Sequence, residues 1–269
     1  MTTDTRGPGN WSGVADAYAD TFAHLCAGTI PALLHEAELD SDTDVLEVGA
    51  GTGLLSRAIA ATGAGLTAVE PDVDMLRIAG DHVPEEVTLV RASLPRLPVH
   101  DASFDVVIAN FVINHVGDPR AGVAELARAT RPGGRVLFTV WPNRPTVQGT
   151  LFGAVLDASG ATPPTFDKLP PEMDFDRSLE GTAALCRDVG LVDVRADEVS
   201  CTWRIHPNRF WRGLQAGIGG IGKALLQQDE ATRRRMRSSY DDLNRELLDG
   251  DELVFPAVAL LATATRARD

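Results

Sequence analysis

Three glycines at alternate positions, Gly49, Gly51 and Gly53, follow the apolar run Val45–Val48. Glycine permits positive φ angles and lets a ligand approach the main chain, and the first N–H groups of a following helix are unpaired. Glu70 ends the next apolar run, seventeen residues after Gly53. A carboxylate at that place can accept hydrogen bonds from the two hydroxyls of a ribose. Together the two features indicate a small polar ligand that contains adenosine.

Two other interpretations of this loop have to be weighed. Glycines in a strand-to-helix turn can serve close packing alone. A nicotinamide dinucleotide site would need G-x-G-x-x-G, whose third glycine lets the helix pack on the sheet, but Leu54 stands there. A literal G-x-G-x-x-G does occur at Gly217, Gly219 and Gly222, within a helical pattern. Because no strand precedes it, we interpret it as a chance match at a helix break.

The loop and the carboxylate need a scaffold that brings strand ends together. Short apolar runs alternate with helical patterns, as is typical of parallel strands covered on both faces. Five such runs are Val45–Val48, Leu66–Val69, Val87–Val90, Val106–Ala109 and Val136–Val140. Two later runs, Val192–Trp203 and Val254–Thr265, predict further strands. We expect an α/β fold with a doubly wound, mostly parallel, seven-stranded sheet of Rossmann-like type and helical insertions.

The alternation is interrupted after Trp141. Six prolines fall between positions 142 and 171, so we expect an insertion of loops or short helices over 142–176. Residues 177–269 would complete the core with its last strands, and they carry a second, helical insertion at about 205–250. Residues 1–43 form an N-terminal helical segment, and 44–141 are the core that carries the glycine loop.

Composition limits the possible partners. The chain has 38 acidic and 25 basic residues, a formal net charge of -13, and such a surface repels DNA and RNA. Cys26, Cys186 and Cys201 are far apart and no H-x-x-x-H occurs, so we predict neither a disulfide framework nor a metal site. No signal-peptide pattern and no apolar run of about 18 residues is present. We therefore expect a soluble, cytoplasmic protein without a membrane span.

Four segments, in order and at suitable spacing, resemble the class I S-adenosylmethionine-dependent methyltransferases. The similarity is greatest to the ubiquinone/menaquinone-biosynthesis-like group, which acts on small molecules. The segments are Val45–Gly53, Ala68–Asp72 with Met75, Phe104–Asn110 and Arg131–Gly134. The resemblance covers Asp44 to Val140 closely and the rest in outline. It implies an enzyme that transfers a methyl group from S-adenosylmethionine to a small-molecule acceptor and leaves S-adenosylhomocysteine.

The resemblance also implies how the cofactor is held. Its methionine part would be lined by Gly49, Ala50, Gly51 and Gly53, and its ribose would be bound by Glu70. Pro71 and Met75 would flank the adenine, and Asn110 and Phe111 would complete the site. Relatives commonly present an acidic residue to the adenine amino group, whereas this chain has Ser93 there, next to Leu94. Ser93 can still accept a hydrogen bond, and the main chain of Leu94 could contribute.

Two further residues are assigned to the cofactor. A carboxylate inside a buried strand costs free energy unless it is paired. We predict that Glu47 fixes the glycine loop and faces the ammonium end of the cofactor, and a structural hydrogen bond to nearby backbone is the alternative. Trp11, Val14, Tyr18 and Phe22 share one helical face. This face is either a core-facing stripe or part of a lid over the cofactor, in which Tyr18 reaches the cofactor's carboxylate.

Methyl transfer from a sulfonium needs positioning more than acid–base chemistry. An acceptor that carries a proton would profit from a base, and His115, just past the fourth strand, is the candidate. A cap or a packing role is the alternative for His115. The aromatic residues Trp141, Phe166, Phe210 and Trp211 could line a pocket for a lipophilic or aromatic acceptor, or could be plain core. There are two rival functions. One is a non-catalytic cofactor-binding module of the same fold, and the less favoured one is an NAD-dependent dehydrogenase.

Overall fold

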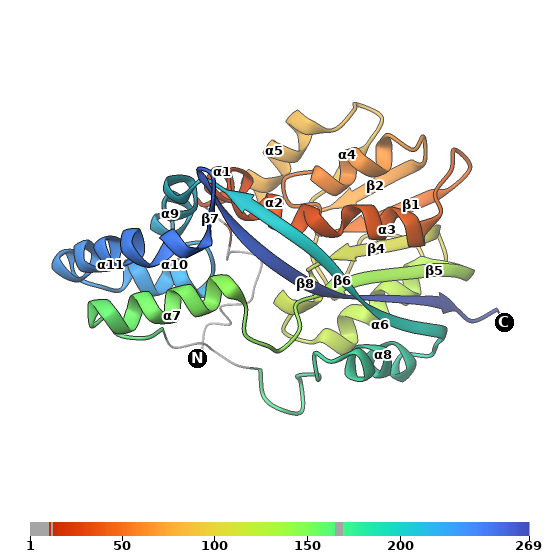
Figure 1. Cartoon of the computed structure of the whole chain (residues 1–269). Helices are drawn as coiled ribbons and strands as arrows, with labels where there is room; N and C mark the ends of the chain where they lie inside the picture. Colours follow the sequence, from red (N-terminus) through yellow and green to blue (C-terminus); the bar gives the residue numbers. More distant parts are fainter. Residues whose placement is uncertain (1–10, 12, 165–168, 269) are drawn as a thin grey trace.

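A twisted sheet forms the centre of the molecule (Figure 1). The computed structural model describes residues 11, 13–164 and 169–268. Within these residues the strand order is β3-β2-β1-β4-β5-β8-β6, with β7 paired to β8. The strands are β1 (Asp44–Val48), β2 (Gly65–Val69), β3 (Thr88–Val90), β4 (Phe104–Asn110), β5 (Thr130–Val140), β6 (Leu191–Ile205), β7 (Leu248–Asp249) and β8 (Glu252–Arg266).

Strands β1 to β5 pair in parallel, and β8 runs antiparallel to both β5 and β6. The expected mostly parallel α/β sheet is therefore confirmed. Besides the seven predicted strands, the described part of the chain contains the two-residue strand β7, which is too short to leave a pattern in the sequence.

Helices cover both faces of the sheet, as Figure 1 shows. Val45 and Leu46 are neighbours in β1, and both are fully buried. Since successive side chains of a strand point to opposite faces, both faces of the sheet must be covered. Val45 packs in a cluster with residues of α3 and α4, whereas Leu46 packs in another with residues of α6 and α8. The bounds are α3 (Ile30–Ala37), α4 (Leu54–Ala60), α5 (Val73–His82), α6 (Pro119–Ala129) and α8 (Leu179–Asp188).

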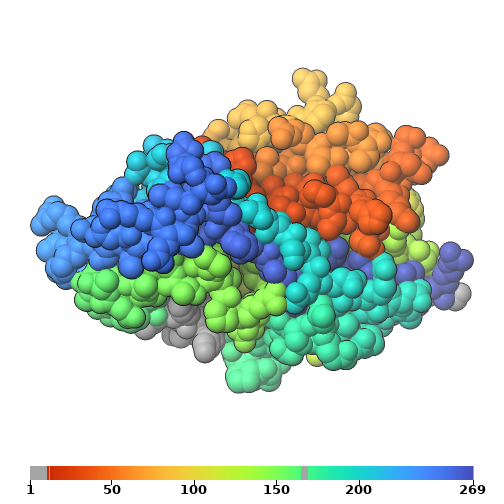
Figure 2. All heavy atoms as spheres, viewed as in Figure 1, coloured from red at the N-terminus to blue at the C-terminus, as the bar shows by residue number. Residues whose placement is uncertain are grey.

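A helical lobe extends from one end of the sheet (Figures 1 and 2). Strands β6 and β8, of 15 residues each, continue beyond the core and carry Trp203 and Phe255 into a separate hydrophobic cluster. In Figure 2 α7, in green, lies along α11, in blue. The lobe consists of α7 (Val147–Ser159), α9 (Pro207–Gln215), α10 (Gly219–Leu226) and α11 (Glu230–Leu243).

The lobe corrects one expectation and agrees with another. Loops or short helices were expected over 142–176, but α7 has 13 residues. The reason is that prolines flank this stretch at Pro145 and Pro163 and none lies inside it. The helix break expected at the second glycine pattern is present, because α9 ends before α10 begins and Gly217 and Gly219 have φ of 89° and 65°.

The N-terminal segment is a chain of short helices rather than one. They are α1 (Ala15–Ala19), α2 (Phe22–Cys26) and the 3-10 turn η1 (Ala27–Thr29), followed by α3. The single helical face predicted from Trp11 to Phe22 is wrong, because the backbone leaves the helical region at Thr21, with φ -133° and ψ -88°. Two further 3-10 turns are η2 (Ile113–His115) and η3 (Asn244–Leu247). Among the described residues, no helix combines the length and apolar character that a bilayer span requires.

Candidate active site

A cavity of about 460 Å³ opens where β1, β2 and β4 end. The carboxyl ends of parallel strands meet at one edge of a sheet, which is where such folds bind ligands. His115 and ten of the thirteen predicted cofactor residues line this cavity. The ten are Tyr18, Gly49, Gly51, Glu70, Pro71, Met75, Ser93, Leu94, Asn110 and Phe111, and the other three, Glu47, Ala50 and Gly53, do not line it.

The three loop glycines differ in what surrounds them. All have positive φ, between 55° and 83°, a region that side-chain-bearing residues rarely adopt. A Cβ on Gly49 would lie 2.3 Å from Cγ2 of Val112, and one on Gly53 would lie 3.0 Å from the Cα of Ala79. A Cβ on Gly51 would have no protein atom within 4 Å apart from those of its two chain neighbours. Gly49 and Gly53 thus permit close packing, and Gly51 borders the open space of the cavity.

Glu70 joins the end of β2 to the glycine loop. Its Oε2 accepts a hydrogen bond from the Gly51 N–H at 2.9 Å, and its Oε1 accepts one from the Asp72 N–H at 3.1 Å. Burial raises the pKa of this carboxyl, and the two N–H donors oppose that shift. Each oxygen keeps a second lone pair. The carboxylate can therefore hold the loop and still accept hydrogen bonds from two ligand hydroxyls.

Glu47 lies behind the loop. The residue is 1% exposed, and its carboxyl accepts a hydrogen bond from the Ser56 hydroxyl of α4. Burial raises its pKa to about 7. The partner within the protein is thus a side chain rather than the nearby backbone of the alternative interpretation, and the contact with the cofactor's ammonium end stays a prediction. Since Ser56 lies just past the glycine loop, this bond ties the strand before the loop to the helix after it.

The N-terminal helices cover one side of the cavity. Trp11 and Tyr18 pack edge to face, with ring centroids 4.9 Å apart, and both contact a small buried cluster around Met75. The Tyr18 hydroxyl donates to Sγ of Cys26 at 3.4 Å, and burial raises the pKa of Tyr18 well above 10.0. Phe22 also lines the cavity, although α2 begins a new helix. The tertiary arrangement thus brings together aromatic residues that the helix break separates.

Asn110 connects this N-terminal segment to the sheet. Its Oδ1 accepts from the hydroxyls of Thr29 and Thr139 at 2.8 and 2.6 Å, and its Nδ2 donates to the Cys26 carbonyl at 3.1 Å. The next residue, Phe111, has φ of 59°, which is rare for an aromatic residue and marks a constrained site. Asn110 therefore borders the cavity, while its side chain is already engaged by protein groups.

The aromatic residues proposed for an acceptor pocket fall into two groups. Trp141 lines the cavity, and its ring stacks on Phe111 with centroids 4.0 Å apart and planes at 15°. Phe210 and Trp211 are buried in the lobe, at 0% and 4% exposure, and do not line the cavity. Their interpretation as plain core is thus the one that the structure supports. Phe166 lies outside the described residues.

His115 ends η2 at the cavity wall. Its ring meets Trp11 edge to face at 5.7 Å. Desolvation by the surrounding protein, and then the charges of Lys223 and Arg177, lower the pKa of His115 below 6.5. The residue also keeps an exposed surface, and an unprotonated imidazole at this wall can accept a proton. Across the described residues, no cluster of three or more His, Cys, Asp or Glu side chains could hold a metal ion.

Some lining residues were not found from the sequence. Leu25 and Cys26 come from the second N-terminal helix, Ile218 comes from the turn between α9 and α10, and Gly219 is the first residue of α10. The glycine pattern marked that turn as a helix break, but nothing in the pattern placed it beside the first glycine loop. Such a placement depends on how the lobe folds back on the core.

Comparison with known proteins agrees with this geometry. A family profile described as a methyltransferase domain matches residues 46–138. A demethylmenaquinone methyltransferase of Clavibacter sepedonicus is 39% identical to this chain over 106 residues, which are 38% of this chain and 42% of that protein. The chain thus spans about two fifths of that relative's length. For this domain, the resemblance to class I S-adenosylmethionine-dependent methyltransferases is confirmed.

Solved structures extend the likeness beyond the methyltransferase domain. The YcgJ protein from Bacillus subtilis is 20% identical, with a TM-score of 0.56, over 90% of this chain and 98% of its own. Phosphoethanolamine N-methyltransferase 2 from Haemonchus contortus is 17% identical, with a TM-score of 0.53, over 88% of this chain and 51% of its own. At these identities the likeness concerns the fold.

Proposed function

We propose that this protein transfers a methyl group from S-adenosylmethionine to a small-molecule acceptor. The observation that carries the proposal is the hydrogen bond between Glu70 and Gly51 at the edge of the cavity. It places a carboxylate with free lone pairs beside the one loop glycine whose Cβ position is open. The methyltransferase of Haemonchus contortus, which shares the fold, was solved with S-adenosylhomocysteine.

The residues of the cavity fit the parts of this cofactor. Glu70 would accept hydrogen bonds from the ribose hydroxyls, and the main chain at Gly51 would lie against the methionine part. Pro71 and Met75 supply apolar surface for the adenine, and Ser93 supplies a hydroxyl at its edge. When bound, the cofactor supplies a methyl group already activated by a positively charged sulfur.

The protein then has to position the acceptor and exclude water. The stacked pair Phe111 and Trp141, with Phe22 and Ile218, gives the cavity an apolar wall. We infer a lipophilic or aromatic acceptor from this wall, and the demethylmenaquinone methyltransferase relative supports it. In this proposal residues 1–43 act as a lid, 44–141 bind the cofactor, and the insertions at 142–176 and about 205–250 complete the acceptor side.

His115 would take a proton from an oxygen or nitrogen acceptor. A neutral imidazole on the cavity wall can do so without metal or a second base. Replacing His115 by Ala should then lower turnover by about a hundredfold, the lower range for general base catalysis. A loss of less than about tenfold would remove this role and leave His115 as a packing residue.

The cofactor assignment is tested by calorimetry with S-adenosylhomocysteine and with NAD⁺. We expect the first to bind and the second not to. Glu70→Gln should weaken S-adenosylhomocysteine by about tenfold, because the ribose hydroxyls lose a charged acceptor. Glu86→Gln, at an exposed position near the end of α5, is the matched control. Binding of NAD⁺ alone, or equal affinities for both variants, would contradict the assignment.

Transfer itself is tested with cofactor labelled in its methyl group. Incorporation of label into a pool of small metabolites, separated by chromatography, supports an enzyme. Binding without any incorporation would favour the non-catalytic module. We further propose that the protein works in the cytoplasm and does not act on nucleic acid, since its net charge of -13 repels a polyanion. Label recovered in added RNA or DNA would contradict the second statement.

A further inference from the structure

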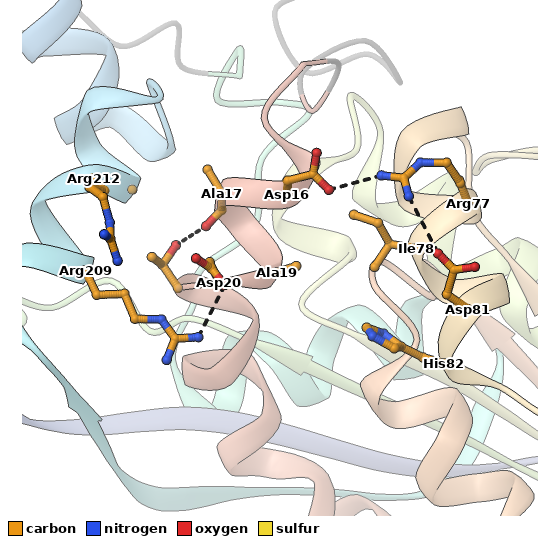
Figure 3. A pocket seen from close by; sticks show the side chains of 12 residues that line it. Asp16, Ala17, Ala19, Asp20, Arg77, Ile78, Asp81, His82, Arg209 and Arg212 are labelled. Carbon is orange, nitrogen blue, oxygen red and sulfur yellow. Dashed lines mark hydrogen bonds and ion pairs between the residues drawn. The ribbon is translucent and has the colours of Figure 1, made fainter.

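A second cavity, of about 530 Å³, lies between α1, α5 and α9 (Figure 3). We call it the outer cleft. Asp16, Ala17 and Asp20 of the N-terminal segment line it, whereas Tyr18 lines the cofactor cavity. Helix α1 is therefore a wall shared by two cavities. Apart from the N-terminal residues that belong to the proposed lid, no residue of the outer cleft has a part in the methyl transfer proposed above.

Two arginines of α9 extend along one side of the outer cleft. Arg209 and Arg212 are three positions apart, so they share a face of the helix. Figure 3 shows the Arg209 side chain reaching toward Asp20 of the N-terminal segment, with Arg212 on the same side of the cleft. Arg209 meets Asp20 at 3.5 Å, a long and largely exposed ion pair. Within the residues that the structure describes, Arg212 has no carboxylate within salt-bridge distance. Arg212 is exposed, so its guanidinium can be reached from the cleft.

The opposite side of the outer cleft has the reverse character. Arg77 of α5 lies between Asp16, at 3.0 Å, and Asp81, at 3.6 Å, as the dashed lines of Figure 3 show. Its charge is thus fully compensated. A negatively charged ligand would be repelled from this side and attracted to α9. Because Asp20 offsets the charge of Arg209, the net positive charge on the α9 side comes from Arg212, and an anion would be attracted there.

The outer cleft also contacts the glycine loop of the cofactor cavity. His82, at the end of α5, lines the cleft, and its Nδ1 lies 2.8 Å from the carbonyl oxygen of Thr52. Because a carbonyl only accepts hydrogen bonds, Nδ1 carries the proton. Thr52 follows Gly51, the open glycine of the loop. Two elements, α1 and His82, therefore connect the outer cleft to the cofactor cavity.

We propose that the outer cleft binds a small molecule with an oxyanion group, a carboxylate or a phosphate, on Arg209 and Arg212. A guanidinium binds such groups with two parallel hydrogen bonds, and the volume is in the range of small-molecule sites. Such a ligand would contact both α9 and α1, the wall that the two cavities share. Bound ligand therefore holds α1 against the cofactor cavity and strengthens cofactor binding. This second part rests on the proposed function, and the first part does not.

Anion binding is measured by calorimetry on the full chain, with inorganic phosphate in one arm and succinate in the other. We expect saturable binding of at least one, and the tighter one identifies the oxyanion class. Arg212→Ala should weaken it by about tenfold, because a charge-assisted contact is lost. Arg57→Ala is the matched control, since Arg57 is exposed on α4 away from the cleft. No saturable binding, or equal affinities for wild type and Arg212→Ala, would overturn the site.

The connection to the cofactor cavity has its own measurement. S-adenosylhomocysteine is titrated with the tighter anion at saturation and with chloride at equal ionic strength. The anion should tighten binding by about fivefold, and Arg212→Ala should abolish the effect. If the affinity for S-adenosylhomocysteine is unchanged when the anion is bound, the proposed effect on α1 is wrong, but the anion site itself still stands. Absence of S-adenosylhomocysteine binding would overturn the proposed function, while the anion titration still decides the site.

Discussion

The Thr29 hydroxyl donates a hydrogen bond to Oδ1 of Asn110 at 2.8 Å, across 81 positions of sequence. The same oxygen accepts from Thr139, and the amide nitrogen donates to the Cys26 carbonyl. One side chain thus fastens the N-terminal segment to β4 and β5. Asn110→Ala leaves two buried hydroxyls and a carbonyl without this partner. We expect the free energy of unfolding in urea to fall by about 2–4 kcal/mol.

Asn143→Ala is the control for this variant, because Asn143 is exposed and its side chain is not part of the network. Its effect should stay within about 0.5 kcal/mol of zero. If the two variants unfold at the same urea concentration, the network does not fasten the segment.

The close approach of Gly49 and Val112 predicts that a destabilising substitution at Gly49 can be partly relieved by a smaller side chain at position 112. Gly49→Ala would bring a Cβ to 2.3 Å from Cγ2 of Val112, at a φ of 79°. We expect a loss of about 2–3 kcal/mol in the free energy of unfolding, from the clash and the left-handed backbone. Adding Val112→Ala removes the blocking methyl group and should recover part of the loss. A double-mutant cycle in urea measures the coupling, and strict additivity would contradict the contact.

Replacing Gly51 should affect ligand binding more than it affects stability. Apart from its two chain neighbours, no protein atom would lie within 4 Å of a Cβ at Gly51, so Gly51→Ala should cost only the backbone term of about 1–2 kcal/mol. Because the Cβ would enter the cavity, binding of S-adenosylhomocysteine should be lost. A folded Gly51→Ala protein with wild-type affinity in calorimetry would show that the ligand does not approach this loop.

Glu47 predicts a pH dependence of stability. Burial raises its pKa from 4.5 to about 7, so the native state binds more protons than the unfolded state between these values. The free energy of unfolding must then fall as pH rises from about 4.5 to 7, by about 3 kcal/mol in total. In Glu47→Gln the amide oxygen can still accept from Ser56, and this fall should be absent. Urea unfolding of both proteins from pH 5 to 8 measures the difference, and parallel curves would refute it.

Ser93 predicts a gain in affinity. It lines the cavity after β3, where related proteins commonly present an acidic residue to the adenine amino group. Ser93→Asp should tighten S-adenosylhomocysteine by about tenfold, because a carboxylate is a stronger acceptor than a hydroxyl. Ser200→Asp, at an exposed position of β6, controls for the added charge. Equal or weaker binding of S-adenosylhomocysteine by Ser93→Asp would contradict the placement of the adenine next to Ser93.

Much of the cofactor side could be predicted because its signals are local. The glycines and Glu70 stand at the ends of two apolar strands, and parallel pairing of β1 with β2 brings those ends to one edge. Alternation along β1 also puts Glu47 on the face of Val45 rather than that of Leu46. That Ser56 of α4 lies on this face depends on helix packing, and no local pattern encodes it.

The sequence by itself determined the sheet, the glycine loop and the carboxylate, because strand length, apolar runs and glycine spacing act over a few residues. Only the tertiary structure decided which groups meet across long separations. Thr29 reaches Asn110, Trp141 stacks on Phe111, and Arg212 comes to face the N-terminal segment. These contacts arise where separate elements pack together, so their partners are fixed by shape and burial in the whole fold rather than by neighbours in the chain.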